Sequence, residues 1–493
     1  MKKQVFNPYL PLTEYVPDGE PHVFNNRVYV YGSHDAAGSD RFCVNDYTVW
    51  SAPVDDLTDW KCHGTVYKKE QDPRSKSGKL VDLYAPDCVC GIDGRYYLYY
   101  SAMGPNTKNF GPISIAVADQ PEGPFKYYGD VRNSDGRVVL KYLNNDPAVI
   151  NDHGRIWLYY GWGLGRDFRN RLFRPILNKV LSRISGRSVT EINLTEPSIL
   201  SCAVVEIGKD MMTVLTEPKA VLDSKSSAPL HTDFYNHAFY EAPSIRKFSN
   251  LYYLVYSCGA NNALAYATSQ YPDRGFQYRG VIISNSDLEY HGNTEPKAPA
   301  GTIHGGIEEI NGRFYVFYHR LTNNTEFSRQ ACAEPILIQS DGKIDQVEMS
   351  SCGLNGGPLK GEGTYPAAIC CNLVTKKRIP IKFSSGQKYP RIDEVNNEVI
   401  VRDIVQDTIL TYKYFDFQNI GVLTGNVKST DNGCFEILVD DKMIGKINFD
   451  SSSSWQLIGS SLNLPDGIHT FSFRYKGKGK ADIKEFTFIR RTI

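Results

Sequence analysis

The sequence Arg95-Tyr-Tyr-Leu-Tyr-Tyr-Ser101 is one of five copies of an aromatic strand phrase in this chain. Aromatic and β-branched residues are favoured on the pleated, packed surface of a sheet. Each copy follows a short turn, such as Asp93-Gly94 or Asn311-Gly312, and these two dipeptides are strong hairpin signals because they accept positive φ. We therefore predict that each copy is the second strand of a hairpin. The other copies are Arg27-Val-Tyr-Val-Tyr-Gly-Ser33, Arg155-Ile-Trp-Leu-Tyr-Tyr-Gly161, Leu251-Tyr-Tyr-Leu-Val-Tyr-Ser257 and Arg313-Phe-Tyr-Val-Phe-Tyr-His319.

An ionisable residue precedes each copy at a nearly constant distance. Counted back from the third residue of the phrase, Asp18, Asp146 and His304 lie 11 residues away. Asp87 lies 10 residues away and Glu241 lies 12 residues away. Successive copies begin 68, 60, 96 and 62 residues apart, which suits one four-stranded unit per repeat. The spacing predicts radial repetition with five ionisable side chains at a common centre.

These repeats predict an all-β chain in which residues 1–340 form a five-bladed β-propeller. The innermost strand of each blade would carry its ionisable residue to the axis. The alternative is a β-sandwich or several small sheets, with the aromatic phrases as ordinary core strands. That alternative does not explain why the residue at the offset is ionisable in every unit.

The character of the sequence changes after residue 340. Residues 341–375 are rich in Gly, Ser and Cys and are predicted to be a connector. Between residues 398 and 489, eight short strand patterns are separated by turn signals such as Asp431-Asn-Gly and Pro465-Asp-Gly. This pattern is typical of a β-sandwich. We therefore predict a second, jelly-roll domain over residues 376–493.

The third repeat contains an insertion at about residues 163–201, where Ile176, Leu177, Val180 and Leu181 have helical spacing. The helix is either a solvated surface element or a lid or rim over the tunnel mouth, since long insertions in repeat proteins often lie on the binding face.

Composition excludes several classes of function. The formal net charge is zero, and no basic stripe suggests a nucleic-acid partner. No apolar run reaches membrane-spanning length, and the N-terminus lacks an apolar signal core. The 11 cysteines are odd in number and form no Cys-x-x-Cys pairs. We expect buried free thiols, a cytoplasmic location and no organic cofactor.

Several carboxylates converging on one axis indicate a glycosidase. Hydrolysis with inversion needs a general base to activate water and a general acid to protonate the leaving oxygen, roughly 6.5–9.5 Å apart. A propeller tunnel can place carboxylates from different blades at such a separation. A third carboxylate would raise the pKa of the acid by like-charge repulsion.

The chain resembles glycoside hydrolase family 43, the five-bladed arabinofuranosidases and β-xylosidases. The likeness covers residues 5 to about 340 and depends on five motifs that occur in order. They are Pro17-Asp-Gly-Glu-Pro-His-Val-Phe24 with Gly32-Ser-His-Asp35, Tyr84-Ala-Pro-Asp87, Asn145-Asp-Pro-Ala148, Tyr240-Glu-Ala-Pro-Ser244, and Ile303-His-Gly-Gly306 with Tyr318-His-Arg320.

The resemblance implies catalytic roles for three carboxylates. Asp18 would be the general base, Asp146 the residue that modulates the pKa of the acid, and Glu241 the general acid. One departure concerns the base, because the family motif usually reads Asp-Pro, whereas Gly19 follows Asp18. Glu20, which precedes a proline, is therefore the alternative base, although Asp18 has the spacing of the other repeats.

These motifs, together with Arg329 in Ser328-Arg-Gln, give further candidate site residues. Asp87 would contact the substrate or cap its hairpin, and Arg329 would contact the substrate or pair with a carboxylate. His304 would lie beside a central cation, for which we expect a structural Ca²⁺, or be a hydrogen-bonded core histidine. The remaining substrate-binding candidates, Tyr240 and the pair His34 and Asp35, come from the acid and base motifs; His34 and Asp35 are equally plausible as structural hydrogen-bonding partners.

The C-terminal region resembles a family 6 carbohydrate-binding module in Leu464-Pro-Asp-Gly-Ile-His-Thr-Phe471 and in the segment from Tyr475 to Phe488. Trp455 and Tyr475 are candidates for stacking on sugars, or both belong to the core. The domain either binds sugar or only supports the propeller.

The resulting hypothesis is an exo-acting, inverting glycosidase that releases terminal α-L-arabinofuranosyl or β-D-xylosyl residues from plant-derived oligosaccharides. One alternative is a non-catalytic propeller lectin, which would need no triad of carboxylates. Another is a related five-bladed furanosidase such as the fructosidases, which use an aspartate nucleophile. Their usual Asn-Asp-Pro-Asn-Gly phrase near the N-terminus is missing. A panel of aryl glycosides would separate these classes.

Overall fold

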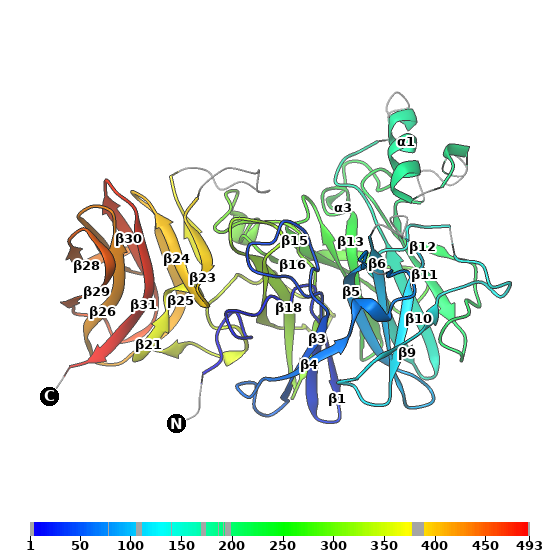
Figure 1. Cartoon of the computed structure of the whole chain (residues 1–493), viewed down its shortest axis with the longest axis horizontal. Helices are drawn as coiled ribbons and strands as arrows, with labels where there is room; N and C mark the ends of the chain where they lie inside the picture. Colours follow the sequence, from blue (N-terminus) through cyan, green and yellow to red (C-terminus); the bar gives the residue numbers. More distant parts are fainter. Residues whose placement is uncertain are drawn as a thin grey trace.

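The computed structural model describes residues 4–76, 78–104, 111–139, 141–168, 174–185, 187–190, 192, 199–376 and 389–491. Strands dominate this part of the chain, which confirms the all-β prediction (Figure 1). Residues 1–336 supply five antiparallel sheets in chain order, four of them with four strands and the last with three.

The strands of the five sheets pair in sequence order. The first sheet contains β1 (Glu20–Phe24), β2 (Arg27–Tyr31), β3 (Tyr47–Pro53) and β4 (Lys61–Tyr67). The second contains β5 (Asp82–Cys90), β6 (Tyr96–Met103), β7 (Ser114–Ala118) and β8 (Lys126–Asp130). The third contains β9 (Ala148–Asp152), β10 (Arg155–Gly161), β11 (Ser201–Ile207) and β12 (Lys219–Asp223). The fourth contains β13 (Phe239–Phe248), β14 (Leu251–Cys258), β15 (Ala263–Ser269) and β16 (Gln277–Ser284). The fifth contains β17 (Ile307–Ile310), β18 (Arg313–Leu321) and β19 (Arg329–Ile336).

Each aromatic phrase forms the second strand of its sheet, as predicted, and the five phrases are β2, β6, β10, β14 and β18. The predicted turns precede them. Asn25 and Asn26 have φ of 49° and 59°, and Asn311 and Gly312 have φ of 50° and 75°. Positive φ at two successive turn residues matches the right-handed twist of the flanking strands.

The first strands of the five sheets lie against one another in succession. β1 contacts β5, β5 contacts β9, β9 contacts β13, β13 contacts β17, and β17 contacts β1. The hairpin registers place one residue of each first strand at the same level: Glu20 pairs with Tyr31, Asp87 with Tyr99, Ala148 with Tyr159, and Ser244 with Val255. In the fifth sheet, the Phe317 N–H donates to the Gly306 carbonyl. We call Glu20, Asp87, Ala148, Ser244 and Gly306 the floor layer.

Two six-stranded sheets follow, shown in yellow to red in Figure 1. One contains β20 (Leu359–Lys360), β22 (Asn372–Val374), β25 (Ile409–Phe417), β27 (Gly433–Val439), β28 (Lys442–Phe449) and β30 (Gly467–Gly477). The other contains β21 (Gly363–Pro366), β23 (Arg391–Val395), β24 (Glu398–Ile404), β26 (Ile420–Ser429), β29 (Ser452–Ser461) and β31 (Ala481–Arg490). All eight predicted C-terminal strands are present, whereas β23 was not predicted. The predicted connector, 341–375, supplies β20, β21 and β22.

One aromatic core joins the two C-terminal sheets. Phe471 of one sheet and Phe488 of the other have ring centroids 5.0 Å apart. Tyr475 also belongs to this core and is fully buried, so of the two possibilities considered for Tyr475 the structure supports the core position and not stacking on sugars. Its ring packs against Phe435 and Phe449 because β30 lies in the middle of its sheet. Trp455 remains 37% exposed.

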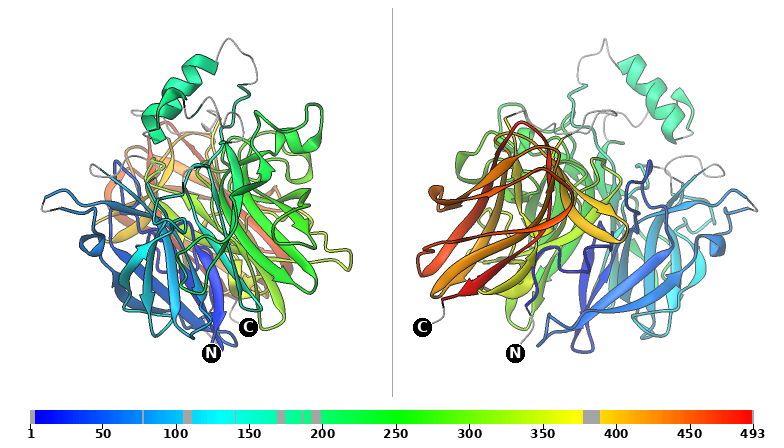
Figure 2. Two further views of the ribbon diagram at one scale, coloured as in Figure 1. Left: turned by 90° about the vertical axis from the view of Figure 1, so that its right-hand side faces the viewer. Right: turned by 60° about the vertical axis from the view of Figure 1, so that its left-hand side comes forward.

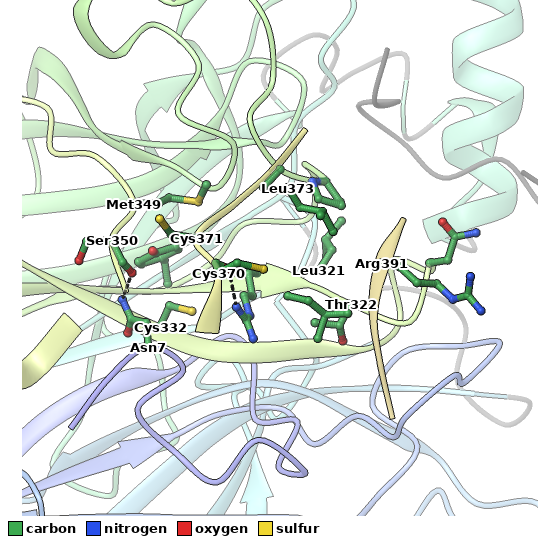
Figure 3. Close-up of a pocket in the computed structure, with 16 residues that line it drawn as sticks. Asn7, Leu321, Thr322, Cys332, Met349, Ser350, Cys370, Cys371, Leu373 and Arg391 are labelled. Atoms are coloured by element: carbon green, nitrogen blue, oxygen red, sulfur yellow. Dashed lines mark hydrogen bonds between the residues drawn. The ribbon is translucent and has the colours of Figure 1, made fainter. Parts of the chain in front are cut away.

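The N-terminal and C-terminal sheets meet along a polar seam, and Figure 2 shows the two groups side by side. The Arg320 Nη2 atom donates to the Ala368 carbonyl at 2.8 Å, and Lys413 Nζ donates to Glu348 at 2.9 Å. A small cavity of about 30 Å³ lies at this seam between Met349, Cys371 and their neighbours (Figure 3).

The helix predicted in the insertion is α1 (Arg174–Ser185), which projects at the top of Figure 1. A second, short helix is α3 (Asp233–Asn236). Leu177 and Leu181 of α1 pack into a small core against Trp162, whereas Ile176 is 62% exposed. None of the described helices has the length and apolar character needed to cross a membrane.

Candidate active site

A pocket of about 280 Å³ lies above the floor layer, where side chains from all five N-terminal sheets and their loops meet. Its lining residues are Asp18, Phe42, Tyr84, Met103, Asn145, Asp146, Trp162, Tyr240, Glu241, Asn261, Thr302, His304, Glu326 and Arg329. Six of the nine predicted site residues are among them: Asp18, Asp146, Tyr240, Glu241, His304 and Arg329. The pocket does not include His34, Asp35 or Asp87.

Local backbone geometry turns the predicted carboxylates toward the pocket. Asp18 and Asp146 each lie two residues before the floor layer, with φ of 57° and 46°. Ala85 and Ala242 occupy the same position in their sheets and also have positive φ, at 36° and 61°. Non-glycine residues rarely adopt this conformation, and they cluster at functional sites. In these four sheets, the chain therefore turns sharply at the residue two positions before the floor layer.

The predicted equivalence of the five ionisable residues holds for Asp18, Asp146 and His304 only. Asp87 lies one layer deeper because the β5–β6 turn is one residue longer: Asp87 and its partner Tyr99 are 12 residues apart, whereas Glu20 and Tyr31 are 11 apart. Tyr84 lines the pocket in its place. Glu241 precedes the equivalent residue, Ala242, by one position.

Asp18 lies in a strongly electropositive environment. Arg329 Nη1 donates to Asp18 Oδ1 at 2.8 Å, and His304 Nδ1 lies 3.9 Å from the same oxygen. The Asp18 N–H also donates to His319 Nδ1 at 3.3 Å. Burial alone would raise the pKa of Asp18, but Arg329 and the two histidines bring it below its usual value. Asp18 is therefore an ionised carboxylate at neutral pH, as a proton acceptor must be.

Asp35 supports this arrangement from outside the pocket. It is fully buried, and it accepts hydrogen bonds from Arg329 Nε at 2.7 Å and Nη2 at 3.1 Å. This two-point contact fixes the plane of the guanidinium group. Arg329 can thus pair with Asp18 and still face the pocket. His34 lies farther out, where its Nδ1 bonds to the Asp46 carbonyl at 2.8 Å.

Asp146 and Glu241 form a second acidic group. The Ala242 N–H donates to Asp146 Oδ2 at 3.1 Å, and Asn261 Nδ2 donates to Glu241 Oε1 at 2.7 Å. Burial raises the pKa of Asp146 well above its usual value, and repulsion from Glu241 and then from Asp18 raises it further. Mutual repulsion favours one shared proton on this pair, so the pair can act as an acid.

The floor layer closes the pocket from below. Ser244 Oγ donates to Glu20 Oε2 at 2.8 Å, and Arg246 Nη2 donates to the same oxygen at 3.1 Å. Gly306 completes this layer, since a Cβ atom at this position would lie only 2.4 Å from Ser244 Oγ. Asp87 is fully buried at this level, with Oδ1 2.6 Å from His22 Nε2.

The donor atoms around His304 test whether the residues present fit the predicted cation. Glu20 Oε1 is buried, has no hydrogen-bond partner among the described residues, and lies 3.8 Å from His304 Nε2. A carboxylate oxygen and an imidazole nitrogen therefore face each other without a bond between them, which fits a cation. Glu20, His22 and Asp87 also cluster within 4.8 Å, but there Arg246 already supplies a positive charge.

Eight of the 14 lining residues were not predicted as site residues, and two of them, Tyr84 and Asn145, lie within the predicted motifs. Phe42 and Glu326 lie in irregular loops that have no periodicity, and Asn261 lies in the turn between β14 and β15. Trp162 could have been found, since it directly follows the aromatic phrase that ends at Gly161.

Comparisons with known proteins agree on one family. The family model of Glycosyl hydrolases family 43 matches residues 12–344. A xylosidase/arabinosidase from Thermoclostridium stercorarium is 40% identical over 505 residues and covers 99% of both chains. A family 43 arabinoxylan arabinofuranohydrolase from Bacillus subtilis, solved with cellotetraose, matches 98% of this chain and 97% of its own, with 20% identity and a TM-score of 0.50.

A β-xylosidase/α-arabinofuranosidase from a compost metagenome, solved with xylotriose in a calcium-free form, covers 69% of this chain and 96% of its own. Its identity is 25% and its TM-score is 0.52. From the family match and the full-length relative, the chain belongs to glycosyl hydrolases family 43.

Proposed function

We propose that the protein is an exo-acting, inverting glycosidase that releases terminal α-L-arabinofuranosyl or β-D-xylosyl residues from plant-derived oligosaccharides. The observation that carries the proposal is a closed pocket in which an ionised Asp18 accompanies the acidic pair of Asp146 and Glu241. The names of the relatives support the substrate class: the full-length relative is a xylosidase/arabinosidase, and solved neighbours bind xylotriose and cellotetraose.

The mechanism uses the carboxylates in separate roles. Asp18 accepts a proton from a water molecule, whose oxygen attacks the anomeric carbon. The glycosidic bond breaks as Glu241 donates its proton to the leaving oxygen. We assign the single proton of the pair to Glu241, so that an ionised Asp146 opposes its loss by repulsion, and Asn261 orients the Glu241 carboxyl group. Arg329 holds Asp18 in place and preserves its negative charge.

The closed floor supports exo action. A polymer cannot thread through the floor layer, which favours binding of a chain end in the pocket. On a linear xylo-oligosaccharide we expect only two early products, the single terminal sugar and the oligosaccharide shortened by one unit, with no shorter internal fragments. Chromatography of the first few per cent of hydrolysis measures this, and a mixture of internal fragments would contradict the exo assignment.

The product should form with inverted anomeric configuration, because we assign Asp18 to activating water and not to forming a bond with the sugar. Proton NMR of the first minutes of hydrolysis, before mutarotation, distinguishes the two anomers. Net retention would rule out the base role of Asp18 and indicate a carboxylate nucleophile, as in the fructosidase alternative. The lectin alternative loses its support because the chain belongs to a hydrolase family.

We further propose that the five N-terminal sheets are the blades of a propeller and that the two C-terminal sheets form a jelly-roll sandwich similar to a family 6 carbohydrate-binding module. The succession of contacts from β1 round to β17 and back to β1 supports the first part. The shared core of the C-terminal sheets supports the second. Trp455 is its candidate for stacking on sugars. The domain boundaries that we propose remain 1–340, 341–375 and 376–493.

A Ca²⁺ ion is proposed beside His304, with Glu20 as the second residue that would hold it. Calcium prefers oxygen ligands, so water molecules would have to complete the shell. When bound, such an ion would supply positive charge near Asp18 and help to keep that carboxylate ionised. The calcium-free form recorded for a solved neighbour supports this proposal.

Removal of calcium should lower activity. Treatment with EDTA is expected to reduce kcat/KM severalfold, and Ca²⁺ should restore it and raise the Tm of the wild type, because a ligand that binds only the native state stabilises it. His304→Ala should abolish the rise in Tm. Full activity and an unchanged Tm after complete chelation would contradict the cation site.

A cytoplasmic location remains our proposal. All 11 cysteines lie in the described part of the chain, and each is a free thiol, which suits a reducing compartment. An oligosaccharide is the proposed partner, and neither a nucleic acid nor a membrane is expected.

A further inference from the structure

The loop between β18 and β19, residues 322–328, joins the C-terminal sheets to the pocket. At one end of the loop, Glu326 lines the pocket and Phe327 packs on Phe42, with ring centroids 4.5 Å apart. The Phe42 ring in turn lies 4.7 Å from the guanidinium carbon of Arg329. The loop therefore supports the residue that binds Asp18.

At its other end, the loop is fastened to the C-terminal edge strand β23 through Asn323. The Asn323 N–H donates to the Ile392 carbonyl at 2.7 Å, and its Oδ1 accepts from the Glu394 N–H at 3.0 Å. β23 lies at the edge of its sheet, where backbone groups lack a neighbouring strand. Asn323 satisfies two of these groups and so extends the sheet toward the N-terminal domain.

A side-chain network strengthens this junction. Asn323 Nδ2 donates to the Tyr15 hydroxyl group at 3.3 Å, and Tyr15 donates to Glu394 Oε2 at 2.9 Å. The seam cavity lies beside the junction and is lined by Thr322, Arg391 and Ile392. Figure 3 shows Thr322 next to the strand that carries Arg391. The contact thus combines residues from the start of the chain, the loop and the C-terminal sheet.

We propose that Asn323 is a positioning residue for the substrate pocket. Through Asn323, the C-terminal sheets form a structural part of the active site. The inference rests on the proposed function, because it assumes that the pocket lined by Glu326 and Phe42 binds the sugar. A loop held at both ends keeps these two side chains and Arg329 in one arrangement. A loop released from β23 would allow them to move, which would weaken their contacts with the bound sugar.

Asn323→Gly tests the proposal in the full-length protein. Asn323 has φ of 55°, which glycine adopts without strain, and the N–H bond to Ile392 is retained. The change removes the side chain that binds Glu394 and Tyr15 and that also donates to the Thr322 hydroxyl group. We expect KM for an aryl arabinofuranoside or xyloside to rise about tenfold with a smaller change in kcat, because the loop shapes the pocket and does not carry the acid or the base.

Two controls separate positioning from general weakening. Asn324→Gly is matched to the test variant, since Asn324 is the next residue, has φ of 54°, and gains the same backbone freedom. Lys413→Met loosens the seam away from the loop by removing the contacts with Glu348 and Asp287. Both should keep KM within about twofold of wild type, although Lys413→Met should lower the Tm.

The outcomes distinguish the inference from the function on which it rests. An inactive wild-type protein would overturn the proposed function. An active wild type with an unchanged KM in Asn323→Gly, or with the same rise in Asn324→Gly, would overturn the positioning role alone. If Asn323→Gly does not fold, Tyr15→Phe tests the positioning role instead, because it removes only the hydroxyl group between Asn323 and Glu394. We expect a smaller rise in KM from it, and no rise would contradict the proposal.

Discussion

Asp18→Asn is expected to lower kcat by about 10²–10⁴-fold, the usual contribution of a general base, while the protein stays folded. The amide has the size of the carboxylate and still offers an oxygen to Arg329, so the hydrogen bond at 2.8 Å can persist. It cannot accept a proton from water. The measurement is kcat on an aryl glycoside, with thermal unfolding as the check on folding.

Glu20→Gln is the matched control, because it makes the same change of carboxylate to amide two residues away. The amide keeps an oxygen that can accept from Ser244 and Arg246, as Glu20 Oε2 does. With Ca²⁺ present, we expect activity within about tenfold of wild type. An inactive Glu20→Gln beside an active Asp18→Asn would transfer the role of base to Glu20.

The sequence predicted those parts of the fold that depend on local patterns. A hairpin needs only a turn such as Asn311-Gly312 and an aromatic strand, so each aromatic phrase was placed correctly. The eight C-terminal strands were found for the same reason. The insertion helix was found because Leu177 and Leu181 repeat at helical spacing. In each of these cases, neighbouring residues determine the structure.

The parts that were missed depend on register or on distant contacts. The offset of Asp87 looks like that of Asp18, and only the pairing of Asp87 with Tyr99 reveals that Asp87 lies a layer deeper. The short strand β23 gains part of its pairing from Asn323, about 70 residues away in the chain. The loops that contain the pocket residues Phe42 and Glu326 have no periodic pattern, so nothing in a single sequence indicates that these two residues meet at one pocket.

Glu241→Ala should lose activity according to the leaving group. A natural disaccharide leaves as a sugar alcohol and needs a proton, so we expect a loss of about 10²–10⁴-fold in kcat/KM. An activated aryl glycoside leaves as a stabilised phenolate and needs little protonation, so the loss should be much smaller. The ratio of the two losses is the measured quantity. Equal losses on both substrates would mean that Glu241 does not act as the acid.

Asp146→Asn tests the other member of the acidic pair. Turnover requires the acid to be protonated, so the alkaline limb of the pH–rate profile follows the loss of its proton. An ionised neighbouring carboxylate opposes the loss of this proton and so keeps the alkaline limb at higher pH. The same repulsion within the pair contributes to the raised pKa of Asp146 beside Glu241. A neutral amide removes the repulsion, so the limb should move to lower pH. The profile reports macroscopic values of the coupled pair, and the sign of the movement is therefore the test. If the alkaline limb stays in place and kcat at the optimum pH is unchanged, Asp146 does not have the modulating role. The pKa of Glu241 would then be raised by burial alone.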